Sequence, residues 1–199
     1  MQRPGYIPGA DERCAAPFLR RFVLVFFDNI LIYSSSLAEH LRHVRSVLTV
    51  LHQHRLFVKR SKCAFGVDYI SYLGHVISAT GLAMDPDKVQ AVADWPTPRS
   101  ARAVRGFLGL AGYYRKFVKE FGTIAAPLTA LLKEGFAWTE ATSVAFTTLK
   151  TAVTTAPILA LPDFGQPFIV ECGASTYGFG AILLQGQHPV VFFSRPVVP

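Results

Sequence analysis

An acidic turn between two apolar segments is the first feature of the chain that could support chemistry. Asp28 and Asn29 lie between the segments FVLVFF and ILIYS, which predicts a β-hairpin with the pair at its tip. Carboxylate oxygens are ligands that Mg²⁺ prefers, and two such ions can hold the attacking and leaving oxygens in nucleotidyl transfer. Because Asp and Asn also favour ordinary turns, a metal site at Asp28 and a plain hairpin both stay open.

A basic segment near the middle of the chain could bind a polyanion. It contains no acidic residue, and its glycines recur at every third position. Its basic residues are Arg99, Arg102, Arg105, Arg115, Lys116 and Lys119, and its glycines are Gly106, Gly109 and Gly112. Each glycine costs a helix roughly 1 kcal/mol relative to alanine, so three of them indicate a close neighbour, either another helix or a sugar-phosphate backbone. Tyr113 and Tyr114 could stack on nucleotides or fill a core.

Composition excludes several classes of protein. Hydrophobic residues at 51% and charged residues at 17% argue against disorder, and 20 Lys and Arg against 13 Asp and Glu favour a polyanionic partner. No apolar run reaches the roughly 18 residues of a membrane span, and the N-terminus has no signal-peptide core. Cys14, Cys63 and Cys172 form no C-x-x-C pair, which argues against a zinc site or a disulfide framework. We therefore expect an intracellular protein, in the nucleus or the cytoplasm.

Hydrophobic spacing predicts the elements that position these residues. After the hairpin, Ser36 and Glu39 form a capping box for a helix that ends near His54 and packs on a sheet through Leu37, Leu41, Val44, Leu48 and Leu51. A strand is predicted over Leu56–Phe65, and a hairpin is predicted from Tyr69–Ile77 and Leu82–Met84. Helices are predicted to begin at Asp85, at Ser100 (ending near Phe121) and at Thr139, and strands to cover Phe168–Glu171, Gly178–Leu184 and Val190–Ser194.

Several motifs, in order along the chain, resemble the reverse transcriptase of gypsy-type LTR retrotransposons. They are FVLVFFDNILIYS, SKCAFG, YLGHVIS, DPDKVQAVADWPTP, RGFLGLAGYYRKFVKEF and PILALPDFGQPFIVECGAS. The similarity runs from about Phe22 to Arg195. It implies an RNA-directed DNA polymerase and an RNase H-like domain that use Mg²⁺. The implied partner is a template–primer duplex or an RNA–DNA hybrid, bound without sequence preference.

The resemblance also implies roles for single residues. Asp28 and Asn29 occupy the position of the catalytic aspartate pair, and Lys62, or alternatively Lys59, lies near the phosphates of the incoming nucleotide. The primer grip, which holds the primer 3′ end, corresponds to Tyr72, Leu73, Gly74 and His75. The thumb helix, which follows the duplex, corresponds to the basic segment with Arg102, Arg105, Gly106, Gly109, Tyr113, Tyr114, Arg115 and Lys116.

Departures from the family pattern bear on catalysis. The family has a second aspartate at Asn29 and the first RNase H aspartate at Gly173, which has no ligand atom. Glu171 lies two residues away on the same strand face, roughly 6–7 Å along the strand, which makes it a poor substitute. The third polymerase carboxylate belongs to an upstream strand that we expect the chain to lack, and the other RNase H carboxylates lie beyond Pro199. One carboxylate is a poor holder for two Mg²⁺ ions.

The sequence therefore predicts an α+β fold with four parts. These are a leader over 1–21 that does not resemble the family, a partial palm over 22–84, a thumb over 85–135, and a connection with the first RNase H-like strands over 136–199. Three hypotheses stay open. The chain is a piece of an active enzyme that needs a missing upstream palm, a nucleic-acid-binding remnant without catalysis, or a degenerate product without a selected function.

Overall fold

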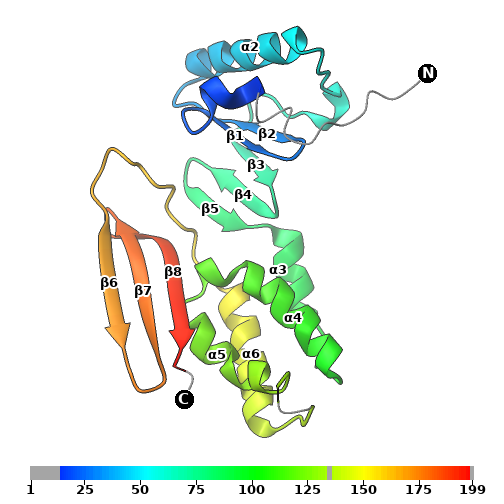
Figure 1. The fold of residues 1–199 in the computed structure, drawn as a ribbon, viewed down its shortest axis with the longest axis vertical. Coiled ribbons are helices and arrows are strands. Elements are labelled where there is room, and N and C mark those ends of the chain that lie inside the picture. The colour runs from blue at the N-terminus through cyan, green and yellow to red at the C-terminus, as the bar shows by residue number, and fades with distance from the viewer. Residues whose placement is uncertain (1–13, 134–135, 198–199) are drawn as a thin grey trace, which may run out of the picture. The chain divides into compact units, whose positions relative to one another are not determined.

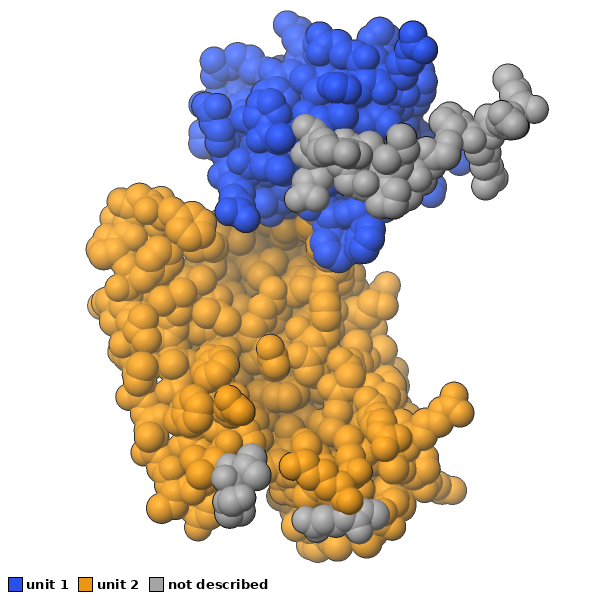
Figure 2. All heavy atoms as spheres, in the orientation of Figure 1, with its two compact units in different colours: residues 1–68 blue, residues 69–199 orange. Residues whose placement is uncertain are grey.

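The computed structural model describes residues 14–133 and 136–197, so residues 1–13 of the expected leader lie outside the described residues. The chain forms two compact units, residues 1–68 and residues 69–199 (Figure 1, Figure 2). Each unit has its own hydrophobic core. No helix within the described ranges has the length and apolar character needed to cross a lipid bilayer.

The first unit is a hairpin packed on one long helix. After a 3₁₀ turn, η1 (Ala16–Phe18), strands β1 (Val23–Phe26) and β2 (Asn29–Ile32) pair antiparallel, and α2 (Leu37–Gln53) follows. Val23 is fully buried, and Val47 and Leu51 of α2 pack with it. Ala15 belongs to the same core, so the N-terminal segment contributes packing from that residue onward.

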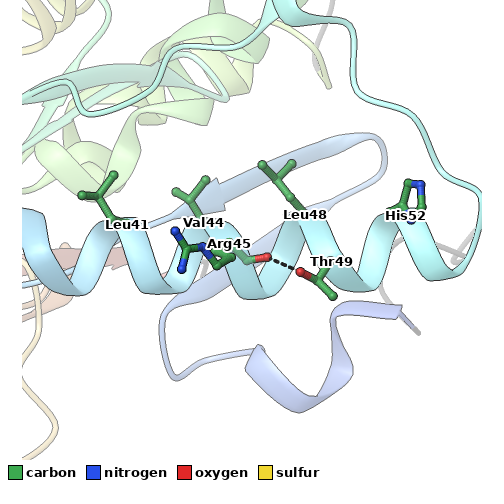
Figure 3. Close-up of a pocket in the computed structure, with 6 residues that line it drawn as sticks. All are labelled: Leu41, Val44, Arg45, Leu48, Thr49 and His52. Carbon is green, nitrogen blue, oxygen red and sulfur yellow. Dashed lines mark hydrogen bonds between the residues drawn. The ribbon is translucent and has the colours of Figure 1, made fainter.

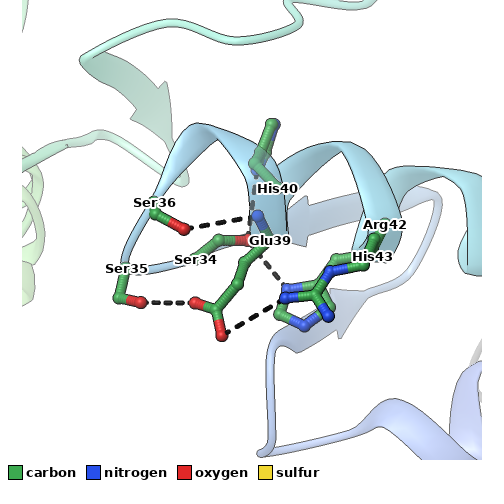
Figure 4. A network of polar contacts seen from close by, with 7 residues as sticks. All are labelled: Ser34, Ser35, Ser36, Glu39, His40, Arg42 and His43. Atoms are coloured by element: carbon green, nitrogen blue, oxygen red, sulfur yellow. Dashed lines mark hydrogen bonds and ion pairs between the residues drawn. The ribbon is translucent and has the colours of Figure 1, made fainter.

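Helix α2 begins as the sequence predicts, with one difference in its cap. The Ser36 hydroxyl accepts a hydrogen bond from the Glu39 backbone N–H at 3.3 Å. The Glu39 carboxylate accepts from the Ser35 hydroxyl and lies 3.8 Å from the Arg42 guanidinium (Figure 4). It is therefore Ser35, rather than the Ser36 backbone, that holds Glu39, and its hydrogen bond is the main cause of the lowered pKa of the Glu39 carboxyl.

The expected packing of α2 is only partly correct. Leu37 and Leu41 are 67% and 61% exposed, whereas Val47 and Leu51 face the core. Figure 3 shows Leu41, Val44 and Leu48 on one side of the helix, where they line a shallow groove of about 460 Å³ with Arg45, Thr49 and His52. The helix thus carries two apolar rows, and only the row through Val47 and Leu51 lies fully in the core of its own unit.

The strand predicted over Leu56–Phe65 is not present. The segment is irregular apart from the 3₁₀ turn η2 (Arg60–Lys62), and Lys62 lies exposed on that turn. Phe57 is 83% exposed, although its alternation with polar residues suggested a buried face. A strand needs a neighbouring strand for its backbone hydrogen bonds, and no described strand pairs with this segment.

The second unit opens with a three-stranded meander, β3 (Tyr69–Tyr72), β4 (His75–Ser78) and β5 (Gly81–Met84), paired in that order. The sequence predicted one strand over Tyr69–Ile77. The chain instead reverses at Leu73-Gly74, where Tyr72 pairs with His75. Both turn residues have positive φ, 50° and 70°, as tight hairpin turns require.

Four helices form the core of the second unit. They are α3 (Pro86–Ala93), α4 (Ala101–Tyr113), α5 (Phe121–Ala130) and α6 (Glu140–Thr154), capped at their N-termini, α5 excepted, by the side chains of Asp85, Ser100 and Thr139. Val104, Phe107, Leu128 and Leu149 are fully buried between them. The predicted start of each capped helix is confirmed.

Helix α4 ends earlier than the sequence predicts. It stops at Tyr113, and a 3₁₀ turn, η3 (Arg115–Phe117), follows in place of a helix to Phe121. Side chains three residues apart eclipse in a 3₁₀ turn, and Tyr114 and Phe117 are both 1% exposed. The tighter turn therefore places both rings in the core.

The C-terminal strands form an antiparallel sheet, β6 (Ile169–Ala174), β7 (Gly178–Gln185) and β8 (His188–Pro196), in that order. The sheet adjoins α5 through β8, where the Gly122 N–H donates to the Ser194 hydroxyl at 2.8 Å. A Cβ on Gly122 would lie 2.9 Å from the Pro196 ring, so glycine permits this approach. Helices and antiparallel sheets occupy separate segments, which confirms the α+β class.

Candidate nucleic-acid interface

The acidic turn lies on a hairpin as predicted, but the tip is shifted by one residue from the expected Asp28-Asn29 pair. Phe26 pairs with Asn29, so Phe27 and Asp28 form a two-residue turn. Phe27 has φ 52° and is 67% exposed, an uncommon conformation for a bulky side chain. The Asn29 amide donates to the Asp28 carboxylate at 3.3 Å, and this contact is exposed to solvent. The amide therefore turns a donor toward the one carboxylate of the turn.

The residues at this turn do not fit a two-metal site. Asn29 offers a neutral oxygen where a second charged ligand would stand, and its amide nitrogen faces Asp28. Among the described residues, no three His, Cys, Asp or Glu side chains gather closely enough to hold a metal ion. Mg²⁺ prefers carboxylates in near-octahedral geometry, and this turn offers a single carboxylate, that of Asp28.

Gly173 lies in the exposed strand β6, opposite Gly180 of β7. A Cβ built on Gly173 would meet nothing within 4 Å, so an aspartate would fit sterically. Glu171 lies two residues away on the same strand and is also exposed. Gly173 therefore leaves space for a carboxylate side chain but has none itself.

The turn between β3 and β4 is tied to the end of α4 by two tyrosines. The Tyr113 hydroxyl donates to the Leu73 carbonyl at 2.7 Å, and the Tyr114 hydroxyl donates to the Gly74 carbonyl at 2.8 Å. Burial raises the pKa of Tyr114 to about 12, with Tyr113 and Asp85 as smaller causes, so the hydroxyl stays protonated and donating. These two bonds fix the β3–β4 turn against α4.

His75 lies behind this turn in an aromatic cage. Its ring centroid is 5.4 Å from that of Tyr113, 5.5 Å from that of Tyr114 and 5.7 Å from that of Phe117. The Nδ1–H donates to the Leu73 carbonyl at 2.7 Å, and Nε2 is buried without a hydrogen-bond partner. Burial, followed by the charge of Lys116, lowers the pKa of His75.

One face of α4 is exposed, basic and smooth. Arg102, Arg105, Gly106, Gly109 and Tyr113 are all exposed, and their spacing of three or four residues places them on one side of the helix. A Cβ on Gly109 would meet nothing within 4 Å, and one on Gly106 would only touch Trp95 at 3.5 Å. Close helix packing therefore does not explain Gly109, because the space beside it is open.

Other sequence-predicted residues lie elsewhere. Arg115 is exposed on η3, whereas Lys116 is partly buried, and its Nζ lies 5.4 Å from the centre of the Phe117 ring. Burial lowers the pKa of Lys116. Tyr114 lies in the core, one of the two alternatives that the sequence left open. Lys62 belongs to the first unit, whereas the α4 face belongs to the second.

Sequence reasoning missed two residues that shape this face. Trp95 lies beside Gly106, and Phe117 closes the cage around His75. The Phe117 contact has a sequence signal, since Tyr114 and Phe117 are three residues apart, but that spacing also fits an α-helix. Trp95 follows α3 in a proline-rich connection and has no such signal.

Two family models match the chain, and together they cover most of it. Residues 9–77 match "Reverse transcriptase (RNA-dependent DNA polymerase)", and residues 138–199 match "RNase H-like domain found in reverse transcriptase". The first match begins at residue 9, inside the segment over 1–21 that we expected to lie outside the family.

Curated relatives agree with these matches. An uncharacterized mitochondrial protein of Arabidopsis thaliana is 49% identical over 67% of this chain and 86% of its own length. The Pol polyprotein of transposon 297 from Drosophila melanogaster is 37% identical over 94% of this chain, and that of transposon gypsy is 35% identical over 86%. The chain belongs to the reverse transcriptase–RNase H region of retrotransposon Pol polyproteins. It spans 18% of the length of each of these two polyproteins.

Solved structures of similar fold are foamy viral protease-reverse transcriptases. One in complex with double-stranded DNA has a TM-score of 0.83 and 22% identity, and covers 100% of this chain and 44% of its own. One in complex with an RNA/DNA hybrid has a TM-score of 0.83 and 22% identity, and covers 94% of this chain and 26% of its own. At this identity the similarity shows the reverse transcriptase fold. Members of the family generally use divalent metals.

Proposed function

We propose that this reverse transcriptase segment binds duplex nucleic acid through the exposed face of α4 and the adjacent β3–β4 turn, without catalysing phosphoryl transfer itself. In this assignment the β3–β4 turn is the primer grip and α4 is the thumb helix. The main support for this proposal is the open surface at Gly109. Exposed arginines lie beside it on α4, and Tyr113 extends the same face to the turn.

The chemistry of this face suits a sugar-phosphate backbone. Arg102 and Arg105 can donate to phosphate oxygens, which position a duplex without reading its sequence. Gly106 and Gly109 expose helix backbone on the same side, so a polyanion can approach closely. Tyr113 is 52% exposed beside Leu73 and can contact a sugar or a base. Such a face is expected to bind non-specifically, at something like 10⁻⁴–10⁻⁶ M.

Two further points support this class of partner. The foamy viral reverse transcriptases of similar fold were solved with double-stranded DNA or an RNA/DNA hybrid. The formal charge of this chain is +7, which favours a polyanion. The proposed lack of catalysis rests on Asn29 and Gly173, because each provides no carboxylate at a position where the family has an aspartate.

A bulky side chain at Gly109 tests the proposed face. Gly109→Leu keeps the fold, because the space is open and leucine favours a helix more than glycine does. We expect it to weaken binding to a primed duplex about tenfold, as measured by fluorescence anisotropy, because the leucine holds the phosphates away.

The matched control places the same leucine on another exposed helix surface. Thr148 of α6 is exposed, so Thr148→Leu should keep the affinity of the parent chain. If Gly109→Leu binds as tightly as Thr148→Leu, the α4 face is an ordinary surface. The hypothesis of a degenerate product without selected binding then stands ahead.

A further inference from the structure

The contacts that join the primer-grip turn to the thumb surround one histidine, His75. Tyr113 and Tyr114 hold the two turn carbonyls, and the His75 ring lies between those tyrosines and Phe117. His75 is 7% exposed, and it bonds to the same Leu73 carbonyl that Tyr113 holds. The ring therefore shares an acceptor with Tyr113 and contacts the ring of Tyr114, so its protonation can disturb both tyrosine contacts.

We propose that His75 is a proton-sensitive latch, which closes the joint between the primer-grip turn and the thumb when neutral and opens it when protonated. This inference rests on the proposed function, since it names a control on the same duplex-binding face. The ligand is the duplex already proposed, and the new element is the dependence of its binding on proton concentration.

The hydrogen-bond pattern assigns the neutral ring. A backbone carbonyl can only accept, so Nδ1 carries the proton that bonds to Leu73, and in the neutral ring Nε2 then carries a lone pair. Nε2 is buried without a hydrogen-bond partner. A second proton at Nε2 would therefore create a buried charged donor with no acceptor, an arrangement that burial strongly disfavours. Outward movement of the ring, with loss of the turn contacts, relieves it.

The charge of Lys116 acts in the same direction. The ionisable groups on the elements around the ring are Tyr72 on β3, Asp85 at the end of β5, Tyr113 and Tyr114 at the end of α4, and Lys116 on η3. Lys116 opposes a second positive charge, and Asp85 acts on Tyr114. The lowered pKa of His75 means that the fold favours the neutral ring. The neutral His75 ring therefore contributes its full stabilisation of the fold at a pH above the ordinary histidine pKa of about 6.5. This stabilisation is lost as the pH falls from that value through the lower pKa of the folded state.

The latch predicts that duplex affinity falls at lower pH, whereas the added positive charge of the chain alone would raise it. The chain has five other histidines. Their protonation adds positive charge, which strengthens binding to phosphates. Opening of the latch weakens binding, because the primer-grip turn leaves its position beside the α4 face. The sign of the change in affinity therefore separates the two causes.

The test compares duplex affinity at pH of about 7.5 and about 5.5 at constant salt, a range in which histidine titrates. For the parent chain we expect about fivefold weaker binding at the lower pH, because such a change corresponds to the loss of one neutral hydrogen bond. His75→Phe, which keeps a ring in the cage and cannot titrate, should bind more tightly at the lower pH. His188→Phe changes an exposed histidine of the same unit, and this variant should lose duplex affinity at the lower pH as the parent chain does. Tighter binding by the parent at the lower pH would overturn the latch.

A second measurement needs neither a variant nor a ligand. Nuclear magnetic resonance of the parent follows the His75 ring and the Gly74 amide as the pH falls below about 6.5. A shared midpoint supports the latch, and a Gly74 amide that stays unchanged while His75 titrates overturns it. If the parent binds no duplex at either pH, the proposed function fails, and this titration still decides the latch.

Discussion

At the scale of single residues, the β3–β4 turn depends on a glycine that is constrained in two ways. Gly74 has φ 70°, and a Cβ there would lie 2.9 Å from the Tyr114 hydroxyl. The residue therefore meets a backbone demand and a packing demand at once. Gly109 meets neither, because it is helical and has open space beside it.

Gly74→Ala should lower the free energy of unfolding by about 1–3 kcal/mol, because alanine must adopt a left-handed conformation and displace the Tyr114 hydroxyl. Urea denaturation measures the change. Gly109→Ala is the control, and it should raise stability by up to about 1 kcal/mol, because alanine favours a helix. Equal effects of the two substitutions would contradict this account of the turn.

At the scale of elements, sequence patterns located helix starts better than their ends. Side-chain caps at Ser36, Asp85, Ser100 and Thr139 are local signals, and all four act as caps in the structure. The end of α4 depends on a tertiary demand, the burial of Tyr114 and Phe117, which no local pattern reveals. The reversal at Leu73-Gly74 was missed because apolar residues continue through it, and Leu73 is not a usual residue for positive φ.

The same limit explains two further differences between sequence and structure. The alternation in Leu56–Phe65 fits a strand, but pairing partners are a property of the whole fold. The α2 helix carries apolar residues on two rows, and periodicity alone cannot say which row is buried. For the candidate site, the sequence placed Arg102, Arg105, Gly109 and Tyr113 on one helix, and the structure places them on one exposed face.

Substitutions on the two rows of α2 should differ in cost. Leu51 is 5% exposed, so Leu51→Ala should destabilise the first unit by about 2–5 kcal/mol through a lost contact and a cavity. Leu41 is 61% exposed, so Leu41→Gln should change stability by less than about 0.5 kcal/mol. Circular dichroism during denaturation measures both. A large cost for Leu41→Gln would mean that this row is covered in solution.

At the scale of the whole molecule, the chain combines a reverse transcriptase fold with few carboxylates at the positions that we propose for catalysis. The charge of +7 and the smooth α4 face favour a duplex partner, while the acidic turn holds a single carboxylate. Binding to phosphates needs only arginines and an accessible backbone, whereas phosphoryl transfer needs metals held by several carboxylates. The two properties can therefore separate in one chain.

The purified chain should not extend a primed template with Mg²⁺ or Mn²⁺, and it should not cleave an RNA–DNA hybrid. The reason is the neutral Asn29 and Gly173, each at a position where the resemblance to the family implies a metal-binding carboxylate. Gly173→Asp alone should not produce cleavage, although the side chain fits, because one restored carboxylate does not complete a site that must hold two metal ions. Template-dependent extension that Asp28→Ala abolishes would overturn this part of the proposal.

The salt dependence of duplex binding tests the central claim most directly. Arg102, Arg105 and Arg115 are exposed, so their joint replacement by glutamine should leave the fold intact. Each phosphate contact contributes roughly one unit to the slope of log affinity against log salt, so the triple variant should flatten that slope by up to about three units. Replacement of Arg42, Arg45 and Arg55 by glutamine removes the same charge from the first unit and should leave the slope of the parent nearly unchanged. If both variants flatten the slope equally, the charge of the whole chain governs binding, and the α4 face is not the interface.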